Sequence, residues 1–126
     1  MSRRTVLLID DEPDIRAVVE LSLGSVAGWD VLTAGSGADG VDVAAERQPD
    51  VILLDVMMPE LDGPATLDAL RGRDETRAIP VLFMTAKAQA GELSRYASLG
   101  VAGVIPKPFD PMTLHDRVAA ALGWEA

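Results

Sequence analysis

Residues 6–11, V-L-L-I-D-D, give the first indication of the fold, because four apolar residues end abruptly at two acids. A short apolar run without polar alternation is typical of a strand that is buried on both faces. The same kind of run recurs along the chain at a spacing of roughly 20–30 residues. The expected strands are Val6–Ile9, Val31–Thr33, Val51–Leu54, Pro80–Met84 and Ala102–Ile105.

The segments between these runs have the spacing of amphipathic helices. One apolar stripe consists of Ile15, Val18, Val19, Ser22 and Val26, and another consists of Leu114, Val118, Ala121 and Leu122. Strict alternation of five strands and five helices predicts an α/β fold, (βα)5, with a doubly wound five-stranded parallel sheet that is covered on both faces.

Residues that favour helix ends support this assignment. Ser36, with Asp39 three residues later, resembles a capping box at the start of one helix. Asp110-Pro111 predicts another helix start, and Gly123 indicates the end of the last helix.

The composition is that of one ordered domain over residues 1–126, with 48% hydrophobic and 25% charged residues. The chain has no cysteine, which excludes disulfides and cysteine-based zinc sites. A net charge of −9 argues against direct binding to nucleic acid or to anionic lipid. The longest uncharged run, between Arg95 and Lys107, holds 11 residues, and a membrane-spanning helix needs about 20. We therefore expect a cytoplasmic protein that does not bind membranes.

Polar side chains follow four of the five expected strands. Asp10 and Asp11 come after the first, Asp55 after the third, Thr85 after the fourth, and Lys107 closely after the fifth. In sheets of this type ligands bind beyond the carboxyl ends of the strands. The sequence therefore predicts that three carboxylates, a hydroxyl and an ammonium group converge at one edge of the sheet.

This set of groups suits phosphoryl transfer to a carboxylate. Three converging carboxylates repel one another, which raises their pKa values, and a hard divalent cation such as Mg²⁺ relieves that repulsion. One carboxylate is then able to attack an electrophilic phosphorus atom. Lys107 and the Thr85 hydroxyl are suited to stabilise the charge on the transferred phosphoryl oxygens.

Four motifs stand in order along the chain: L-I-D-D-E-P at 8–13, L-L-D-V-M-M-P-E-L-D-G at 53–63, M-T-A at 84–86 and K-P-F at 107–109. With them the chain resembles a bacterial response-regulator receiver domain over about residues 4–123. The resemblance implies a flavodoxin-like strand order of 2-1-3-4-5. It also implies a stand-alone receiver like the chemotaxis regulators, or a receiver excised from a larger protein.

The resemblance implies a role for each site residue. Asp55 is the expected phosphoacceptor. Asp11 and Asp55 are expected to bind Mg²⁺, or another divalent cation such as Mn²⁺, through their side chains. The backbone carbonyl of Met57 is the expected third ligand, and Asp10 is expected to hold the metal through water.

The resemblance also implies how the phosphoryl group is held and passed on. Lys107 is expected to contact its oxygens, Thr85 to donate a hydrogen bond to it, and the Lys107–Pro108 peptide to be cis. The expected donor is a phosphohistidine on a sensor histidine kinase or a histidine phosphotransfer protein. The output is altered binding of a protein partner at the face of the fourth helix, fifth strand and fifth helix. Such a module belongs to a two-component or phosphorelay system and is no enzyme beyond its own phosphorylation and dephosphorylation.

One position departs from the family pattern. Three residues before the lysine, receivers typically carry Tyr or Phe, whose ring changes position on activation, and here the residue is Val104. Valine is short and stiff at χ1, so it cannot perform that ring movement. We expect the loop after Thr85 and the fourth helix, Ala88–Leu99, to carry the conformational response, with Tyr96 as a packing residue.

Other readings remain open at this stage. G-S-G-A-D-G at 35–40 matches a dinucleotide-binding fingerprint, with Asp55 at the spacing of a ribose-binding acid. That reading leaves Asp10, Asp11, Thr85 and Lys107 without a role. An aspartyl phosphatase of similar layout usually has a second acid two residues after its nucleophile, where this chain has Met57. A receiver that works without phosphorylation is a third reading. His115, the only histidine, is a conceivable phosphocarrier that we expect to be solvated.

Overall fold

The computed structural model describes residues 3–124, in which strands and helices alternate as the sequence predicts. The strands are β1 (Thr5–Ile9), β2 (Asp30–Ala34), β3 (Val51–Asp55), β4 (Val81–Thr85) and β5 (Gly103–Pro106). The helices are α1 (Pro13–Leu21), α2 (Gly37–Arg47), α3 (Gly63–Arg71), α4 (Ala90–Ser98) and α5 (Leu114–Leu122), with a π-helical segment, η1 (Ser22–Val26), directly after α1.

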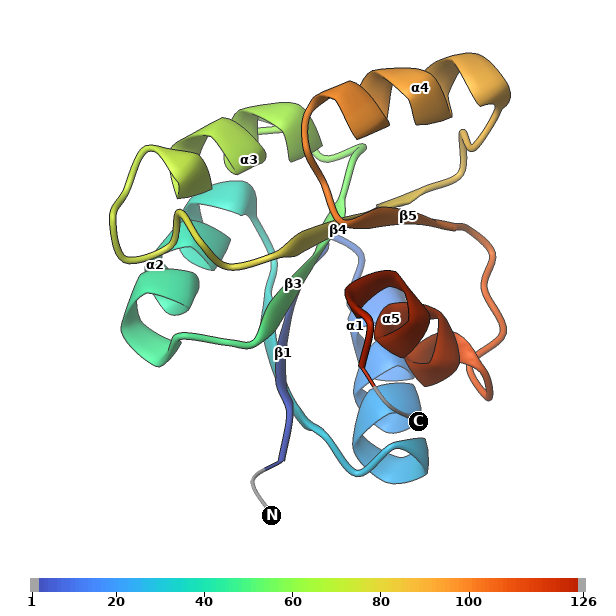
Figure 1. Cartoon of the computed structure of the whole chain (residues 1–126). Coiled ribbons are helices and arrows are strands. Elements are labelled where there is room, and N and C mark those ends of the chain that lie inside the picture. Colours follow the sequence, from blue (N-terminus) through green and yellow to red (C-terminus); the bar gives the residue numbers. More distant parts are fainter. Residues whose placement is uncertain (1–2, 125–126) are drawn as a thin grey trace.

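The strands form one parallel sheet in the order β2-β1-β3-β4-β5 (Figure 1). This order confirms the predicted doubly wound, flavodoxin-like topology. β3 lies at the centre, and Ile9 at the end of β1 pairs with Leu54 near the end of β3. The last residues of neighbouring strands therefore lie side by side at one edge of the sheet.

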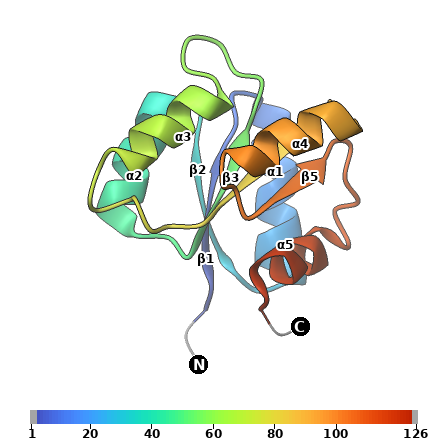
Figure 2. The ribbon, with the colours of Figure 1, turned by 45° about the horizontal axis from the view of Figure 1, so that its top comes forward.

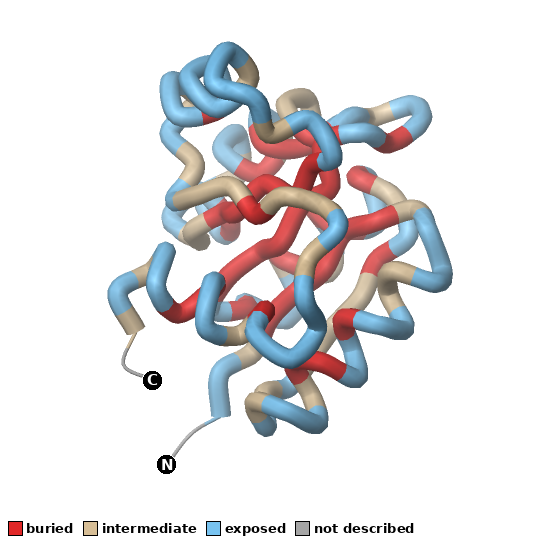
Figure 3. The backbone as a smooth tube through the Cα atoms, turned by 90° about the vertical axis from the view of Figure 1, so that its right-hand side faces the viewer, coloured by how far each residue is buried: buried red, intermediate tan, exposed pale blue. Residues whose placement is uncertain are grey.

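Helices cover both faces of the sheet: α2, α3 and α4 lie on one face and α1 and α5 on the other (Figure 2). Successive strand residues alternate between the two cores, so that Ile52 and Leu54 pack on the first face and Val51 and Leu53 on the second. The central strands consequently run through the buried part of the molecule (Figure 3). This double burial explains why the strands read as continuous apolar runs.

Most of the predicted helix ends are confirmed. The Ser36 side chain accepts a hydrogen bond from the Asp39 amide at 3.2 Å, and Gly123 ends α5 with a φ of 70°. The predicted start of α5 at Asp110-Pro111 is wrong, because that helix begins at Leu114. Asp110 instead accepts a hydrogen bond from the Met112 amide at 2.9 Å, and this local turn delays the helix.

The first predicted apolar stripe is only partly correct. Val19 and Ser22 are buried, but the side chains of Val18 and Val26 are exposed and Leu23 is buried in their place. The change from α1 to η1 at residue 22 explains why Leu23 is buried in place of Val26, because a π-turn inserts a residue relative to the α-helical repeat and rotates the side chains that follow. The second predicted stripe also differs at one position, because in α5 the buried alanine is Ala119 rather than Ala121.

α4 is slightly shorter than the expected helix over Ala88–Leu99, with Gln89 and Leu99 as its caps. Within residues 3–124, no helix has the length and apolar character needed to cross a membrane.

Candidate functional site

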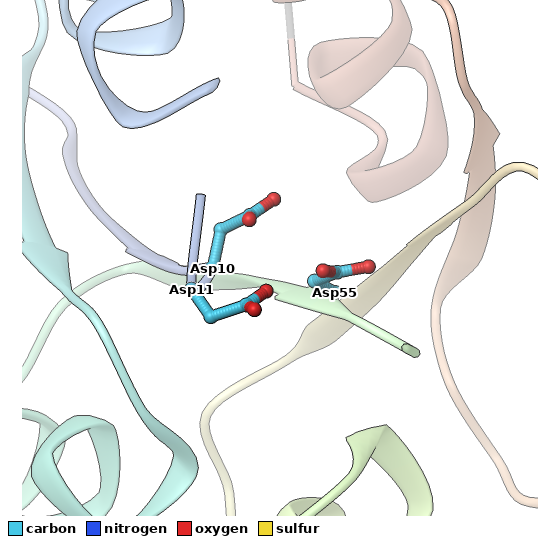
Figure 4. Close-up of side chains that lie close together, drawn as sticks. All are labelled: Asp10, Asp11 and Asp55. Carbon is cyan, nitrogen blue, oxygen red and sulfur yellow. The ribbon is translucent and has the colours of Figure 1, made fainter. Parts of the chain in front are cut away.

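Three carboxylates meet at the carboxyl edge of the sheet. Asp10 and Asp11 directly follow β1, and Asp55 is the last residue of the adjacent strand β3. Each of the three offers an oxygen that lies within 4.8 Å of the others (Figure 4). The parallel register thus produces the convergence that the strand ends predict.

Asp10 is fully buried and already has hydrogen-bond partners for both side-chain oxygens. Its Oδ1 accepts from the Glu12 amide at 2.9 Å, and its Oδ2 accepts from the Lys107 ammonium at 3.0 Å. The backbone amide of Asp10 donates to the Ala34 carbonyl at the end of β2, at 3.1 Å. Asp10 therefore links the ends of three strands.

Asp11 differs from Asp10 because its Oδ1 is buried without a hydrogen-bond partner among residues 3–124. A buried carboxylate oxygen without a hydrogen bond costs free energy of folding, and a bound ligand would remove that cost. Carboxylate oxygens are the ligands preferred by hard cations such as Mg²⁺. The unpaired Asp11 oxygen, beside two other carboxylates, fits a divalent cation.

Asp55 is 3% exposed at the end of the central strand. Its Oδ1 accepts from the Met57 amide at 3.3 Å and lies 3.4 Å from Lys107 Nζ. Burial, followed by the nearby charge of Asp10, raises the pKa of Asp55 to about 6, with Lys107 opposing the shift. The proximity of the two carboxylates accounts for part of that rise.

Lys107 stands directly after β5 and projects its ammonium group toward both buried acids. Burial by itself disfavours the charged ammonium, but the hydrogen bond and charge of Asp10, together with Asp55, outweigh it and raise the pKa of Lys107. The Lys107 amide donates to the Thr85 carbonyl at 2.8 Å. The Lys107–Pro108 peptide is cis, as predicted.

Thr85 is the buried last residue of β4, on the strand next to Asp55. Its Oγ1 accepts a hydrogen bond from the Lys87 amide at 2.9 Å. The hydroxyl oxygen is therefore tied to the loop that leads into α4, which connects the site to that helix.

The loop after Asp55 carries Met57, whose side chain is 59% exposed. The Gly63 amide closes this loop by donating to the Val56 carbonyl at 3.0 Å. A Cβ atom at Gly63 would lie 2.7 Å from Val56 Cα, so only glycine allows this approach. The use of the Met57 carbonyl as a metal ligand stays a prediction.

Two sequence features lie outside this cluster. The glycine-rich loop at 35–40 begins α2, and a Cβ atom at Gly37 would lie 2.2 Å from Thr66 Oγ1, so helix packing accounts for this glycine. The expectation that His115 is solvated is wrong, because its side chain is 27% exposed and packs edge-on against Trp29. Trp29 precedes β2, whereas Asp55 ends β3, so His115 packs at the opposite end of the sheet from the acids.

Sequence reasoning missed one residue that touches the site. Arg16 Nη1 donates to the backbone carbonyl of Asp10 at 2.8 Å. Side chains of a helix tilt toward its N-terminus. An arginine in the first turn of a helix that follows two acids is therefore a sequence signal for a contact between its side chain and the turn that carries the acids.

The chain is similar in sequence to several transcriptional regulators. The DNA-binding dual master transcriptional regulator RpaA of Synechocystis is 38% identical over 117 residues, which are 93% of this chain and 48% of that protein. The alkaline phosphatase synthesis transcriptional regulatory protein PhoP of Bacillus subtilis is 34% identical over 119 residues, or 94% of this chain and 48% of that protein. The chain therefore spans about half the length of these curated relatives.

Solved structures also match over nearly the whole chain. The chemotaxis protein CheY4 of Vibrio cholerae superposes with a TM-score of 0.87 at 30% identity, covering 95% of this chain and 99% of that one. The receiver domain of a Pseudomonas aeruginosa sensor histidine kinase, solved with a magnesium ion coordinated in its active site cleft, matches with a TM-score of 0.84 at 28% identity, covering 97% of this chain and 99% of that one.

The response regulator receiver domain model matches residues 6–119. The general function of this family is that of a phosphorylation switch in two-component signalling, and its members are signalling phosphoacceptors. The acidic cluster, the strand order and the family match agree, and the chain belongs to the response regulator receiver domain family.

Proposed function

We propose that Asp55 of this chain accepts a phosphoryl group from a phosphohistidine in the presence of Mg²⁺, and that its phosphorylation alters the binding of a protein partner. One observation carries the proposal. Three carboxylates converge within 4.8 Å, one of them has a buried oxygen without a partner among residues 3–124, and a lysine ammonium lies against the other two.

The chemistry assigns a task to each group. A carboxylate oxygen of Asp55 attacks phosphorus, and the bond from phosphorus to the donor imidazole nitrogen breaks as the imidazole leaves. The Lys107 ammonium stabilises the charge on the phosphoryl oxygens, and the Thr85 hydroxyl donates a hydrogen bond to them.

The same acids would hold the cation. Asp11 and Asp55 would bind it directly with the backbone carbonyl of Met57, and Asp10 would hold it through water. Asp10 suits this indirect role, because both of its oxygens already accept protein hydrogen bonds. When bound, Mg²⁺ or Mn²⁺ supplies positive charge that offsets the carboxylates and the incoming phosphoryl oxygens.

The donor in this proposal is a sensor histidine kinase or a histidine phosphotransfer protein, and the site of action is the cytoplasm. The output partner is a protein that recognises the face formed by α4, β5 and α5. A net charge of −9 over the 126 residues supports a protein partner rather than direct contact with nucleic acid.

Intact mass spectrometry tests the proposal. The protein is incubated with a small phosphodonor such as acetyl phosphate and with Mg²⁺, and we expect one added phosphoryl group that is absent in Asp55→Asn and after chelation of the metal. Asp62→Asn is the matched control, because Asp62 caps α3 through its side chain and asparagine caps equally well. An unchanged mass with several donors, or a phosphoryl group retained in Asp55→Asn, would contradict the proposal.

A further inference from the structure

We infer that Arg16 is a positioning residue for the cation site: its guanidinium group fixes the peptide between Asp10 and Asp11 and thereby aims the Asp11 carboxylate. This inference rests on the proposed function, because it concerns how strongly the acids bind Mg²⁺. Arg16 itself does not touch the cation in this account.

The contacts place Arg16 over the turn between β1 and α1. Its Nη1 donates to the Asp10 carbonyl at 2.8 Å, and its backbone amide donates to the Glu12 carbonyl at 3.1 Å. The guanidinium group also lies against Gly35 at the end of β2, where a Cβ atom would be 3.3 Å from Nη1. The side chain therefore connects the turn that carries the acids, the helix that follows it and the neighbouring strand end.

The hydrogen bond matters because of the peptide that it holds. The carbonyl of Asp10 belongs to the peptide whose nitrogen is that of Asp11, and this unit is planar. The Asp10 amide, one peptide earlier, is held by the Ala34 carbonyl at 3.1 Å. The peptide after Asp11 is held as well, because the Glu12 amide donates to Asp10 Oδ1 at 2.9 Å. With the peptides on both sides of the Asp11 Cα atom held, the direction of the Asp11 Cα–Cβ bond is fixed.

Asp11 is the acid that most needs such support. Its Oδ1 is buried and unpartnered among the described residues, whereas the side-chain oxygens of Asp10 are held by Glu12 and Lys107. No hydrogen bond to Oδ1 restrains the Asp11 side chain, so the orientation of this side chain depends on its backbone. Residues that hold a metal ligand in place without touching the metal typically change the metal affinity by about 10–100-fold when they are mutated.

Electrostatics alone predicts the opposite effect of a mutation. Arg16 carries a positive charge close to a cation site, so its removal should tighten Mg²⁺ binding if charge were its only influence. A positioning role predicts weaker binding on removal. The sign of the change in affinity therefore separates the two accounts.

The experiment is a Mg²⁺ titration of the full unphosphorylated chain at fixed ionic strength, followed by backbone amide NMR. Arg16→Met keeps much of the aliphatic stem but removes the donor, and we expect its affinity to fall about tenfold or more. Arg16→Lys restores one donor and should recover part of the loss. Arg77→Met is the control for charge, because Arg77 pairs with the exposed Asp74 on the surface, and its affinity should stay within about twofold of the wild type.

Urea unfolding and the NMR spectrum establish that each variant is folded. Should Arg16→Met not fold, Arg16→Gln is judged by the same criterion. Affinity equal to or tighter than that of the wild type in a folded Arg16 variant lacking the guanidinium group overturns the inference and leaves the proposed function standing. A wild-type chain that shows no saturable Mg²⁺ binding overturns both.

Discussion

Lys107 donates a hydrogen bond to Asp10 across the carboxyl edge of the sheet, with 3.0 Å between Nζ and Oδ2. The same ammonium lies 3.4 Å from the Oδ1 atom of Asp55. Asp10 is completely buried, so this ion pair is shielded from solvent, and it connects the ends of β5 and β1 across the two strands that lie between them. Asp10 is thereby committed to protein contacts, whereas the buried Oδ1 atom of Asp11 has no hydrogen-bond partner among residues 3–124.

We predict that Mg²⁺ binding depends more on Asp11 than on Asp10. Asp11→Ala removes the acid whose buried Oδ1 atom has no partner in the described part of the chain, and saturable binding should be lost. In the proposed ligand set Asp10 would reach the cation only through water, so binding in Asp10→Ala should be weakened but measurable. Mg²⁺ titration followed by NMR checks this, and equal, intact binding in both variants would show that the assignment is wrong.

The raised pKa of Asp55 predicts a pH-dependent gain in stability for Asp55→Asn in metal-free buffer. The pKa is 3.8 in the unfolded reference and about 6 in the folded protein. The proton on Asp55 therefore favours the fold below pH 3.8, and this contribution is lost as the pH rises through about 6. Asparagine has no such loss, and at pH 8 it should raise the free energy of unfolding by up to about 3 kcal/mol relative to its effect at low pH.

Urea unfolding at pH 4 and at pH 8 measures this difference. Asp68→Asn is a suitable control, because Asp68 is an exposed aspartate on α3, and its substitution should have nearly the same effect at both pH values. A stability difference between Asp55→Asn and the wild type that does not grow with pH would contradict the prediction.

The sequence was sufficient for the sheet and for the residues at its carboxyl edge. Each buried strand is a continuous apolar run, and the acids and Lys107 stand where those runs stop. Because parallel strands align their ends, the position of a residue along the chain determines its place at the edge.

Features that depend on side chains meeting in space were not predictable in this way. The π-segment η1 buries Leu23 in place of Val26, and the Ser22 side chain donates there to the Pro111 carbonyl, 89 residues away. The late start of α5 follows from the turn at Asp110. The place of Arg16 in the first turn of α1 indicates that it reaches back toward the acids, but not that its partner is the Asp10 backbone carbonyl.

Lys107→Arg should separate cation binding from signalling. Arginine keeps the positive charge but replaces a compact ammonium by a planar, bulkier group. The space is limited, since the Lys107 side chain is 15% exposed and lies between two buried acids. We expect this variant to bind Mg²⁺ but to bind the protein partner poorly after phosphorylation. Binding of the partner by phosphorylated Lys107→Arg at the wild-type level would refute the prediction.

Gly63→Ala should destabilise the protein and disturb the loop after Asp55. The added methyl group would lie 2.7 Å from Val56 Cα and 3.1 Å from the Asp55 carbonyl oxygen, so backbone has to move. We expect a loss of about 1–3 kcal/mol in the free energy of unfolding. Gly91→Ala is the matched control, because nothing lies within 4 Å of its Cβ position, and it should be neutral or stabilising by up to about 1 kcal/mol. A Gly63→Ala protein as stable as the wild type would contradict the packing argument.

The residues around Val104 include an aromatic pair that joins β4 to α4. Val104 is half-buried and pairs in register with Phe83 on β4. The ring of Phe83 packs edge-on against Tyr96 of α4, with 5.3 Å between the centroids. Tyr96 is 1% exposed, so it is the packing residue that the sequence predicts.

We therefore predict that the response to phosphorylation includes residues 86–99. The Thr85 hydroxyl accepts from the Lys87 amide at 2.9 Å, so a hydroxyl that turns toward the phosphoryl group has to change the start of this segment. A conformational change of this kind requires contacts that differ between the two states, and Gly91 eases it by lowering helix stability by about 1 kcal/mol relative to alanine. Backbone amide shifts with Mg²⁺ and a beryllofluoride phosphoryl mimic measure the response, with Asp55→Asn as the control that should show none. Shifts confined to the loops around Asp55 and Lys107, with residues 86–99 unchanged, would exclude this mechanism.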